Sequence, residues 1–232
     1  LQVLDYAVLV ISGTDGVQAH TQTLWQLLRR YRVPVFVFVT KMDLPGAGRA
    51  ALMDDLRAHL SGACVDFTDP DPEQIALCDE AALEQYLDTG ALPDETVRAL
   101  IRRRKLFPCL FGSGLKLTGV DELLAALTRY AAPPDYPSEF GARVYKIMRD
   151  AQGNRLTCLK VTGGQLRVRT PLTYLPRGAD TPVQEKVNAI RLYSGEKFET
   201  AETVPAGGVC AVQGLTQTYP GQGLGSAAAS MP

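Results

Sequence analysis

The sequence predicts an α/β domain built on a parallel sheet, followed by an all-β barrel. Three observations support this prediction. Patterns of buried strands and amphipathic helices alternate through the first half of the chain. Three prolines then fall within residues 131–137. Beyond them, short strand patterns are separated by turns rich in glycine. The 232 residues have the length of one large domain or of two ordinary ones.

The first half has the pattern of βαβ units. Continuous apolar runs at 5–12, 33–39 and 107–111 predict strands buried on both faces of a sheet. Strands separated by helices imply parallel crossovers. Acidic, proline-broken residues 66–73 predict a surface loop, and the basic run 102–105 predicts a solvent-exposed helix end. Amphipathic spacing predicts helices over residues 16–31, 47–60, 79–87, 93–105 and 120–130.

The second half has shorter elements. We expect the first domain to span residues 1–132, a linker 133–138, a barrel 139–225, and the start of a further linker 226–232. The tail from Gly221 to Ser230 is rich in small residues, which is typical of a linker. The spacing predicts strands at 142–148, 156–161, 166–169, 186–192, 197–199 and 208–212.

Composition excludes several function classes. The hydrophobic fraction of 46% and the charged fraction of 21% are ordinary for a globular protein and exclude general disorder. Five scattered cysteines without a CxxC pair argue against a disulfide framework or a zinc site, and two histidines exclude a His-rich metal site. No apolar run could span a bilayer. We therefore expect a cytoplasmic protein, a monomer, with no membrane partner and no bound metal in this chain.

Charge is divided unevenly between the halves. Residues 1–137 carry 13 Lys and Arg against 18 Asp and Glu, a net −5, whereas residues 138–232 carry 11 against 7, a net +4. A basic β-domain suggests a phosphate-rich partner, although a charge of this size is also ordinary for such a domain.

The sharpest local signal is the run Thr40-Lys41-Met42-Asp43, directly after a buried strand. Loops at the carboxyl ends of parallel strands are where α/β proteins bind ligands. A carboxylate there can accept hydrogen bonds from the N1–H and 2-amino group of guanine, a donor pair that adenine lacks. The stem of Lys41 can lie along the base. The alternative is a polar turn in which Asp43 caps the next helix.

A second loop of the same kind follows the strand 107–111. Gly112-Ser113-Gly114-Leu115-Lys116 precedes a predicted helix. The small Gly114 suits a backbone N–H that approaches the guanine O6. The alternative is a helix-entry loop whose glycines supply turn conformations. Two such loops in one sheet are less expected by chance than either alone.

The order of these motifs resembles the translational GTPases, specifically elongation factor G and, more closely, the tetracycline-resistance ribosomal protection proteins. The resemblance covers nearly the whole chain. It is carried by the runs 1–12, Asp15-Gly-Val-Gln18, 36–43, Glu84-Gln-Tyr-Leu87, 112–116 and 119–123, and in the second half by 143–146, 159–163 and 166–169. It implies the base-binding half of a P-loop-type GTPase domain, followed by the β-barrel called domain II.

The resemblance also implies the site residues. Thr40, Lys41 and Asp43 would contact guanine from one loop, and Ser113, Gly114 and Leu115 from the other; no catalytic residue and no metal ligand is assigned. Two positions depart from the family pattern. Thr40 stands where the family has Asn, and a hydroxyl keeps one of the two hydrogen bonds of that amide. Gly114 stands where the family has Ala, a mild change because the backbone N–H makes the contact.

The motifs for the phosphates are absent from the sequence. There is no GxxxxGK[ST] and no Asp-x-x-Gly-His stretch. In the family these precede the position of Leu1, which together with the non-Met start suggests a piece of a longer protein. The intact parent is then expected to bind GTP or GDP with Mg²⁺, to hydrolyse GTP on the ribosome, and to contact ribosomal RNA and proteins through the barrel. This chain alone is not expected to be a GTPase, and it need not bind a cofactor on its own.

Three alternatives remain open from the sequence. The parent could be a housekeeping elongation factor G that drives translocation and does not protect against tetracycline. The chain could be a non-catalytic ribosome- or protein-binding module without nucleotide binding. An unrelated α/β enzyme has no catalytic constellation in its favour.

Overall fold

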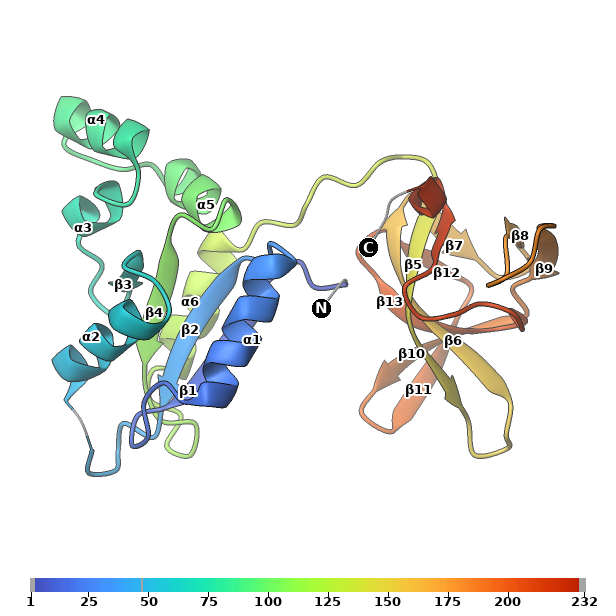
Figure 1. Ribbon diagram of the computed structural model, residues 1–232, viewed down its shortest axis with the longest axis horizontal. Helices are drawn as coiled ribbons and strands as arrows, with labels where there is room; N and C mark the ends of the chain where they lie inside the picture. The colour runs from blue at the N-terminus through green and yellow to red at the C-terminus, as the bar shows by residue number, and fades with distance from the viewer. Residues whose placement is uncertain (1–2, 47, 230–232) are drawn as a thin grey trace. The chain divides into compact units, whose positions relative to one another are not determined.

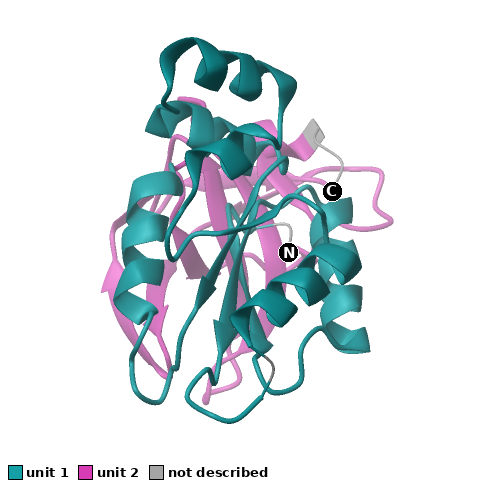
Figure 2. Cartoon of the chain, turned by 90° about the vertical axis from the view of Figure 1, so that its left-hand side faces the viewer, with its two compact units in different colours: residues 1, 3–132 teal, residues 2, 133–232 magenta. Residues whose placement is uncertain are grey.

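The computed structural model describes residues 3–46 and 48–229. The chain forms two compact units, the first over Val3–Ala132 and the second from Pro133 onward (Figure 2). Each unit is built around its own hydrophobic core, and among the described residues no buried core residue is shared between them.

The first unit contains a four-stranded parallel sheet in the order β1-β2-β4-β3 (Figure 1). Every residue of β4 and nearly all of β2 are buried, as expected for central strands covered on both faces. β1 lies at one end of the described sheet, with Val8 39% and Val10 58% exposed. The strands are β1 (Ala7–Ser12), β2 (Val35–Thr40), β3 (Cys64–Asp66) and β4 (Phe107–Phe111).

Helices cover both faces of this sheet. On one face, Trp25 and Leu28 of α1 and Leu56 of α2 pack on inward-facing strand residues such as Val37. On the other face, α5 and α6 pack on a core that includes Phe36. The helices are α1 (Ala19–Arg30), α2 (Arg49–His59), α3 (Pro72–Ala76), α4 (Glu80–Thr89), α5 (Asp94–Arg102) and α6 (Val120–Tyr130).

Two short elements of the first unit, β3 and α3, were not predicted. β3 has three residues, too few for a periodic pattern, and it completes the sheet beside β4. α3 falls in the segment expected to be a surface loop. It forms because Asp71 accepts a hydrogen bond from the Glu73 N–H at 3.0 Å and Pro72 occupies the first turn, where no N–H is needed.

The basic run at the end of α5 is also not simply solvent-exposed. The helix ends at Arg102. Arg104 is partly buried, with its guanidinium 5.0 Å from the centre of the Trp25 ring, and Lys105 forms an ion pair with Asp79. Arg104 therefore packs into the first unit, whereas the other three residues of the run are exposed as predicted.

The second unit is all-β. A six-stranded antiparallel sheet runs β11-β10-β13-β6-β5-β14, and two-stranded pairs β12-β7 and β8-β9 add to it. Its core gathers buried side chains such as Leu159, Ile190 and Val212. The strands are β5 (Gly141–Arg149), β6 (Arg155–Gly163), β7 (Gln165–Arg167), β8 (Pro171–Tyr174), β9 (Val183–Lys186), β10 (Ala189–Ser194), β11 (Lys197–Ala201), β12 (Thr203–Pro205), β13 (Val209–Gln213) and β14 (Gly223–Gly225).

The tail corrects the expectation of a linker from Gly221. β14 pairs with β5, and a 3₁₀ helix, η1 (Ser226–Ala229), follows it. The N–H of Ser226 donates to the Phe140 carbonyl at 2.9 Å, and Ala227 is buried. The described tail is therefore part of the barrel; residues 230–232 lie outside the described residues. The expected linker 133–138 is attached to the barrel at its end, because the Gly164 N–H donates to the Pro137 carbonyl at 2.8 Å.

Candidate functional site

The two predicted loops lie side by side at one end of the parallel sheet (Figure 1). They follow β2 and β4, which are neighbours in register, with Val39 opposite Phe111. Backbone hydrogen bonds join them. The Met42 N–H donates to the Gly112 carbonyl at 3.0 Å, and the Gly112 N–H donates to the Val39 carbonyl at 2.9 Å. The relative position of the loops is thus fixed by main-chain contacts.

The second loop is a closed turn. The Ser113 N–H donates to the Thr118 carbonyl at 2.8 Å, and the Lys116 N–H donates to the Ser113 hydroxyl at 3.2 Å. Gly112 is required by this closure, since a Cβ there would lie 2.1 Å from the Thr118 carbonyl oxygen. Gly114 is not crowded. A Cβ there would lie 3.6 Å from its nearest neighbour, the Thr40 hydroxyl oxygen, which is an ordinary contact.

Asp43 lies between the loops. Its side chain is only 12% exposed, and its carboxylate is 3.8 Å from the Lys116 ammonium. A hydrogen bond from the Ser113 hydroxyl holds the pKa of Asp43 below its ordinary value, helped by its own backbone N–H and by the charge of Lys116, while burial opposes the shift. The carboxylate is therefore ionised at neutral pH and can accept hydrogen bonds.

Thr40 links the loops through its side chain. Its hydroxyl oxygen accepts a hydrogen bond from the Gly114 N–H at 3.2 Å. The next residue, Lys41, is exposed and has a left-handed backbone with φ of 62°. Leu115 is 89% exposed, so its apolar side chain is open to a ligand. All six predicted residues therefore fall in the two joined loops.

A third loop, not predicted as part of the site, follows β1. The Gly13 N–H donates to the Thr40 carbonyl at 2.7 Å, which brings this loop against the first. Hydrogen bonds from the hydroxyls of Ser12 and Thr14 lower the pKa of Asp15, and the charge of Lys41 contributes. The signal was available in the sequence, because β1 is also a parallel strand whose carboxyl end meets the same edge.

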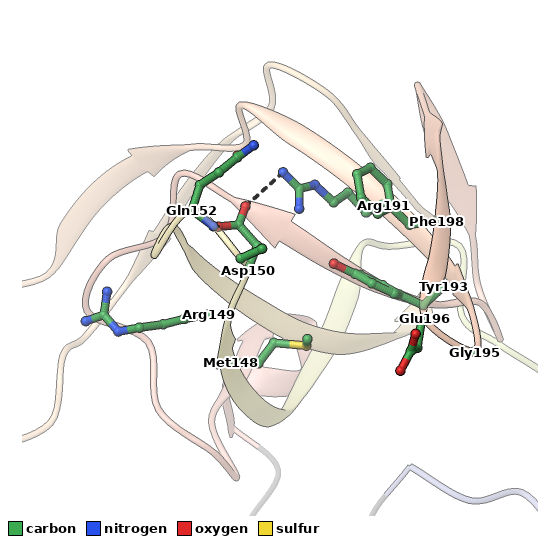
Figure 3. A pocket seen from close by; sticks show the side chains of 10 residues that line it. Met148, Arg149, Asp150, Gln152, Arg191, Tyr193, Gly195, Glu196 and Phe198 are labelled. Atoms are coloured by element: carbon green, nitrogen blue, oxygen red, sulfur yellow. Dashed lines mark hydrogen bonds and ion pairs between the residues drawn. The ribbon is translucent and has the colours of Figure 1, made fainter.

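The barrel carries a separate hollow of about 620 Å³ at the tips of the β5–β6 and β10–β11 hairpins (Figure 3). Arg191 forms an ion pair with Asp150 at 3.1 Å, and its guanidinium lies 4.3 Å from the centre of the Phe198 ring. Tyr193 stands 5.5 Å from Phe198, between ring centres. The hollow therefore combines aromatic faces with two cations, Arg191, which is paired with Asp150, and Arg149, which donates to the Gly153 carbonyl.

Neither a metal site nor a membrane-spanning helix is found among the described residues. No group of three or more His, Cys, Asp or Glu side chains is placed to hold a metal ion. No helix in the described part of the chain is long and apolar enough to cross a membrane.

The fold and the joined loops define a class: a parallel α/β domain of the nucleotide-binding kind, with polar loops at the carboxyl edge of its sheet, followed by a β-barrel. The family model described as Elongation factor Tu GTP binding domain matches residues 1–133, and the chain belongs to this family. This confirms the predicted resemblance to the translational GTPases and the α/β class of the first domain.

The relatives are translation factors and resistance proteins. An oxytetracycline resistance protein of Streptomyces rimosus is 30% identical over 97% of this chain and 39% of its own length. The tetracycline resistance protein TetP of Clostridium perfringens is 27% identical over 97% of this chain and 38% of its own length. Elongation factor G of Ureaplasma urealyticum is 27% identical over 95% of this chain and 42% of its own length. The chain thus spans about two fifths of the length of these relatives.

A solved structure from Thermus thermophilus has the same fold. It superposes with a TM-score of 0.77 at 22% identity, over 97% of this chain and 41% of that one. Both units of the chain therefore have counterparts in one known protein.

Proposed function

We propose that the chain is the base-binding part of a GTP-binding translation factor of the elongation factor G type. The observation that carries this proposal is the joining of two loops at one sheet edge, with an ionised, shielded carboxylate and a backbone N–H between them. Membership in a family of GTP-binding domains supports it.

The proposed chemistry is recognition of guanine by its edge. Asp43 accepts hydrogen bonds from N1–H and the 2-amino group, and the Gly114 N–H donates to O6. Lys41 and Leu115 flank the base, and Ser113 orients the carboxylate. Adenine presents an acceptor at N1 and would leave Asp43 without a donor, so binding of adenine would cost the desolvation of a charge.

The residues present fit the guanosine portion of a nucleotide. The sequence contains no GxxxxGK[ST] run to hold phosphates, and no described cluster is suited to Mg²⁺. We propose that the intact protein binds GTP or GDP with Mg²⁺ through residues outside this sequence and hydrolyses GTP on the ribosome, in the cytoplasm. When bound, Mg²⁺ neutralises phosphate charge; Asp43 and the loops select the base.

The experiment is a titration of the 232-residue chain with guanosine and with adenosine, followed by NMR of the Gly114 amide. We expect saturable shifts with guanosine and none with adenosine. Equal responses to both nucleosides, or to neither, would contradict guanine recognition. If neither binds while the chain still associates with ribosomes, the non-catalytic module is the better description.

We also propose that the β-barrel contacts the ribosome. The barrel half is basic, and the hairpin β10–β11 presents Tyr193 and Phe198, 37% and 45% exposed, beside Arg191 (Figure 3). Exposed aromatic rings suit stacking on unpaired RNA bases, while Arg191, which is paired with Asp150 and only 12% exposed, packs on the Phe198 ring. Loss of ribosome binding on replacing both rings by Ala, with the barrel still folded, would support this contact.

Within the family we propose the tetracycline-protection branch, because the oxytetracycline resistance protein described above is 30% identical to this chain, against 27% for the elongation factor G. The test uses the full-length protein and purified ribosomes. Restored translation in the presence of tetracycline supports protection. Movement of tRNA without such restoration supports a housekeeping translocase instead.

A further inference from the structure

Both groups that would read the guanine edge are already engaged by side chains of the site itself. Asp43 is 3.8 Å from the ammonium of Lys116. The Gly114 N–H donates to the Thr40 hydroxyl at 3.2 Å. The first contact is an ion pair that places a cation beside the acceptor of the proposed site, while the Ser113 hydroxyl donates the hydrogen bond that Asp43 accepts. The second contact is a hydrogen bond that occupies the donor of the site.

The chemistry of the two occupants matches that of the base. An ammonium offers hydrogen-bond donors to the carboxylate, as the N1–H and 2-amino group of guanine would. A hydroxyl oxygen offers an acceptor to the N–H, as O6 would. We infer that Lys116 and Thr40 stand in for guanine in the unliganded protein, so that the base binds by displacing both. This inference rests on the proposed function.

The displacement leaves the loops in place. Their frame consists of backbone bonds, from Met42 to Gly112 and from Ser113 to Thr118, which neither occupant makes with its side chain. The Lys116 side chain is 61% exposed and needs only to rotate into solvent. Thr40 needs only a change of one side-chain torsion. Each occupant is therefore a weak internal competitor: Lys116 balances the charge of Asp43, and Thr40 accepts the hydrogen bond of the Gly114 N–H.

The size of the competition follows from the kind of contact. A partly exposed ion pair at this distance should weaken guanosine binding by roughly two- to fivefold. A neutral hydrogen bond should weaken it by roughly two- to tenfold. The occupants thus set the affinity of the site without touching the bound base.

The experiment titrates guanosine into variants of the full 232-residue chain. A nucleoside is used because phosphates would attract Lys116 for unrelated reasons. We expect Lys116→Met to bind about two- to fivefold more tightly and Thr40→Val about two- to tenfold more tightly than the unaltered chain. Thr40→Ser keeps the hydroxyl, so it should bind guanosine less tightly than Thr40→Val does. Lys186→Met removes an equivalent charge from the exposed β9 of the other unit and should also change nothing.

A second measurement needs no ligand. In the titration of Asp43 by NMR, Lys116→Met should raise the midpoint, whereas Lys186→Met should not. Amide exchange at Gly114 should become faster in Thr40→Val and stay unchanged in Thr40→Ser. These readouts establish the two contacts independently of nucleoside binding.

The outcomes distinguish the stand-in inference from the proposed recognition of guanine. Guanosine binding that is not tightened by either variant overturns the stand-in inference and leaves guanine recognition intact. Weaker binding by Thr40→Val overturns it for Thr40, since the hydroxyl would then contact the base. Absence of guanosine binding in every variant overturns the proposed function and the inference with it.

Discussion

At the scale of single residues, Asp43 is the residue on which base selection depends in the proposed function. Asn in its place offers one donor and one acceptor, so it would meet the 2-amino group of guanine with an N–H and lose a charged acceptor. We predict that Asp43→Asn lowers guanosine affinity by about ten- to a hundredfold. It should improve binding of xanthosine, which carries a carbonyl at that position.

The matched control is Asp54→Asn on α2, where the side chain is 80% exposed. It removes the same charge and should leave both nucleoside affinities unchanged. Isothermal titration of both variants checks the prediction. An Asp43→Asn variant that keeps the guanosine affinity of the unaltered chain would show that another group reads the base.

At the scale of elements, the loop after β4 depends on the glycine that begins it. A methyl group on Gly112 would overlap the Thr118 carbonyl oxygen, which closes the turn, whereas the same group on Gly114 meets only an ordinary contact. We predict that Gly112→Ala lowers the free energy of unfolding by about 1–3 kcal/mol. Gly114→Ala should stay within about 0.5 kcal/mol. Urea unfolding of both variants checks this, and equal losses would contradict it.

An ion pair between Asp94 of α5 and Arg129 of α6 makes the stability of the first unit depend on pH in the acid range. Arg129 donates hydrogen bonds of 2.7 and 2.6 Å to Asp94, and these, with its charge and that of Arg98, hold the pKa of Asp94 below its ordinary value. A lowered folded-state pKa adds stability that is complete above the unfolded value, roughly 4, and is lost as the pH falls through the folded value. We predict that Arg129→Met destabilises the unit at pH 7 and that this loss shrinks as the pH falls below about 4 and Asp94 becomes protonated.

The check is chemical unfolding at several pH values. The curves of stability against pH for Arg129→Met and for the unaltered chain should converge in acid. Arg103→Met, which removes an exposed charge just after α5, should give a curve of unchanged shape. Parallel curves for Arg129→Met would show that the arginine acts only through packing.

The elements also show what the sequence could and could not predict. The bounds of β4 and α6 follow from uninterrupted patterns, an apolar run of 5 residues and an amphipathic segment of 11, and the structure has the same bounds. β3 and α3 depend on a neighbouring strand and on a capping carboxylate, so short windows of sequence carry little signal for them. The tail from Gly221 has the composition of a linker, but pairing with β5 overrides composition.

The candidate site was likewise predictable from the sequence only in part. The adjacency of the loops at Asp43 and Ser113 follows from the rule that parallel strands end at one edge, and could be predicted. The hydrogen bond from Gly114 to Thr40 and the ion pair of Lys116 could not. They depend on side-chain torsions and on the closure of one loop, which no periodic pattern encodes.

At the scale of the whole molecule, the chain is two folding units joined at Pro133. Over the described residues, the cores of the first unit and the core of the barrel have no member in common, and η1 completes the barrel within its own unit. Domains with separate cores can fold alone. We predict that residues 1–132 and residues 133–232, expressed separately, each unfold cooperatively, and that guanosine binding stays with the first fragment.

The first fragment needs one precaution, since exposed Val8 and Val10 on the end strand β1 favour association between chains. Measurements at low protein concentration, with sedimentation as a check, remove this effect.

Circular dichroism melts of the two fragments should then sum to the melt of the whole chain. If residues 133–232 fold alone but residues 1–132 do not, the parallel sheet requires contacts from outside those residues to be stable. Guanosine binding would then have to be tested in the longer protein.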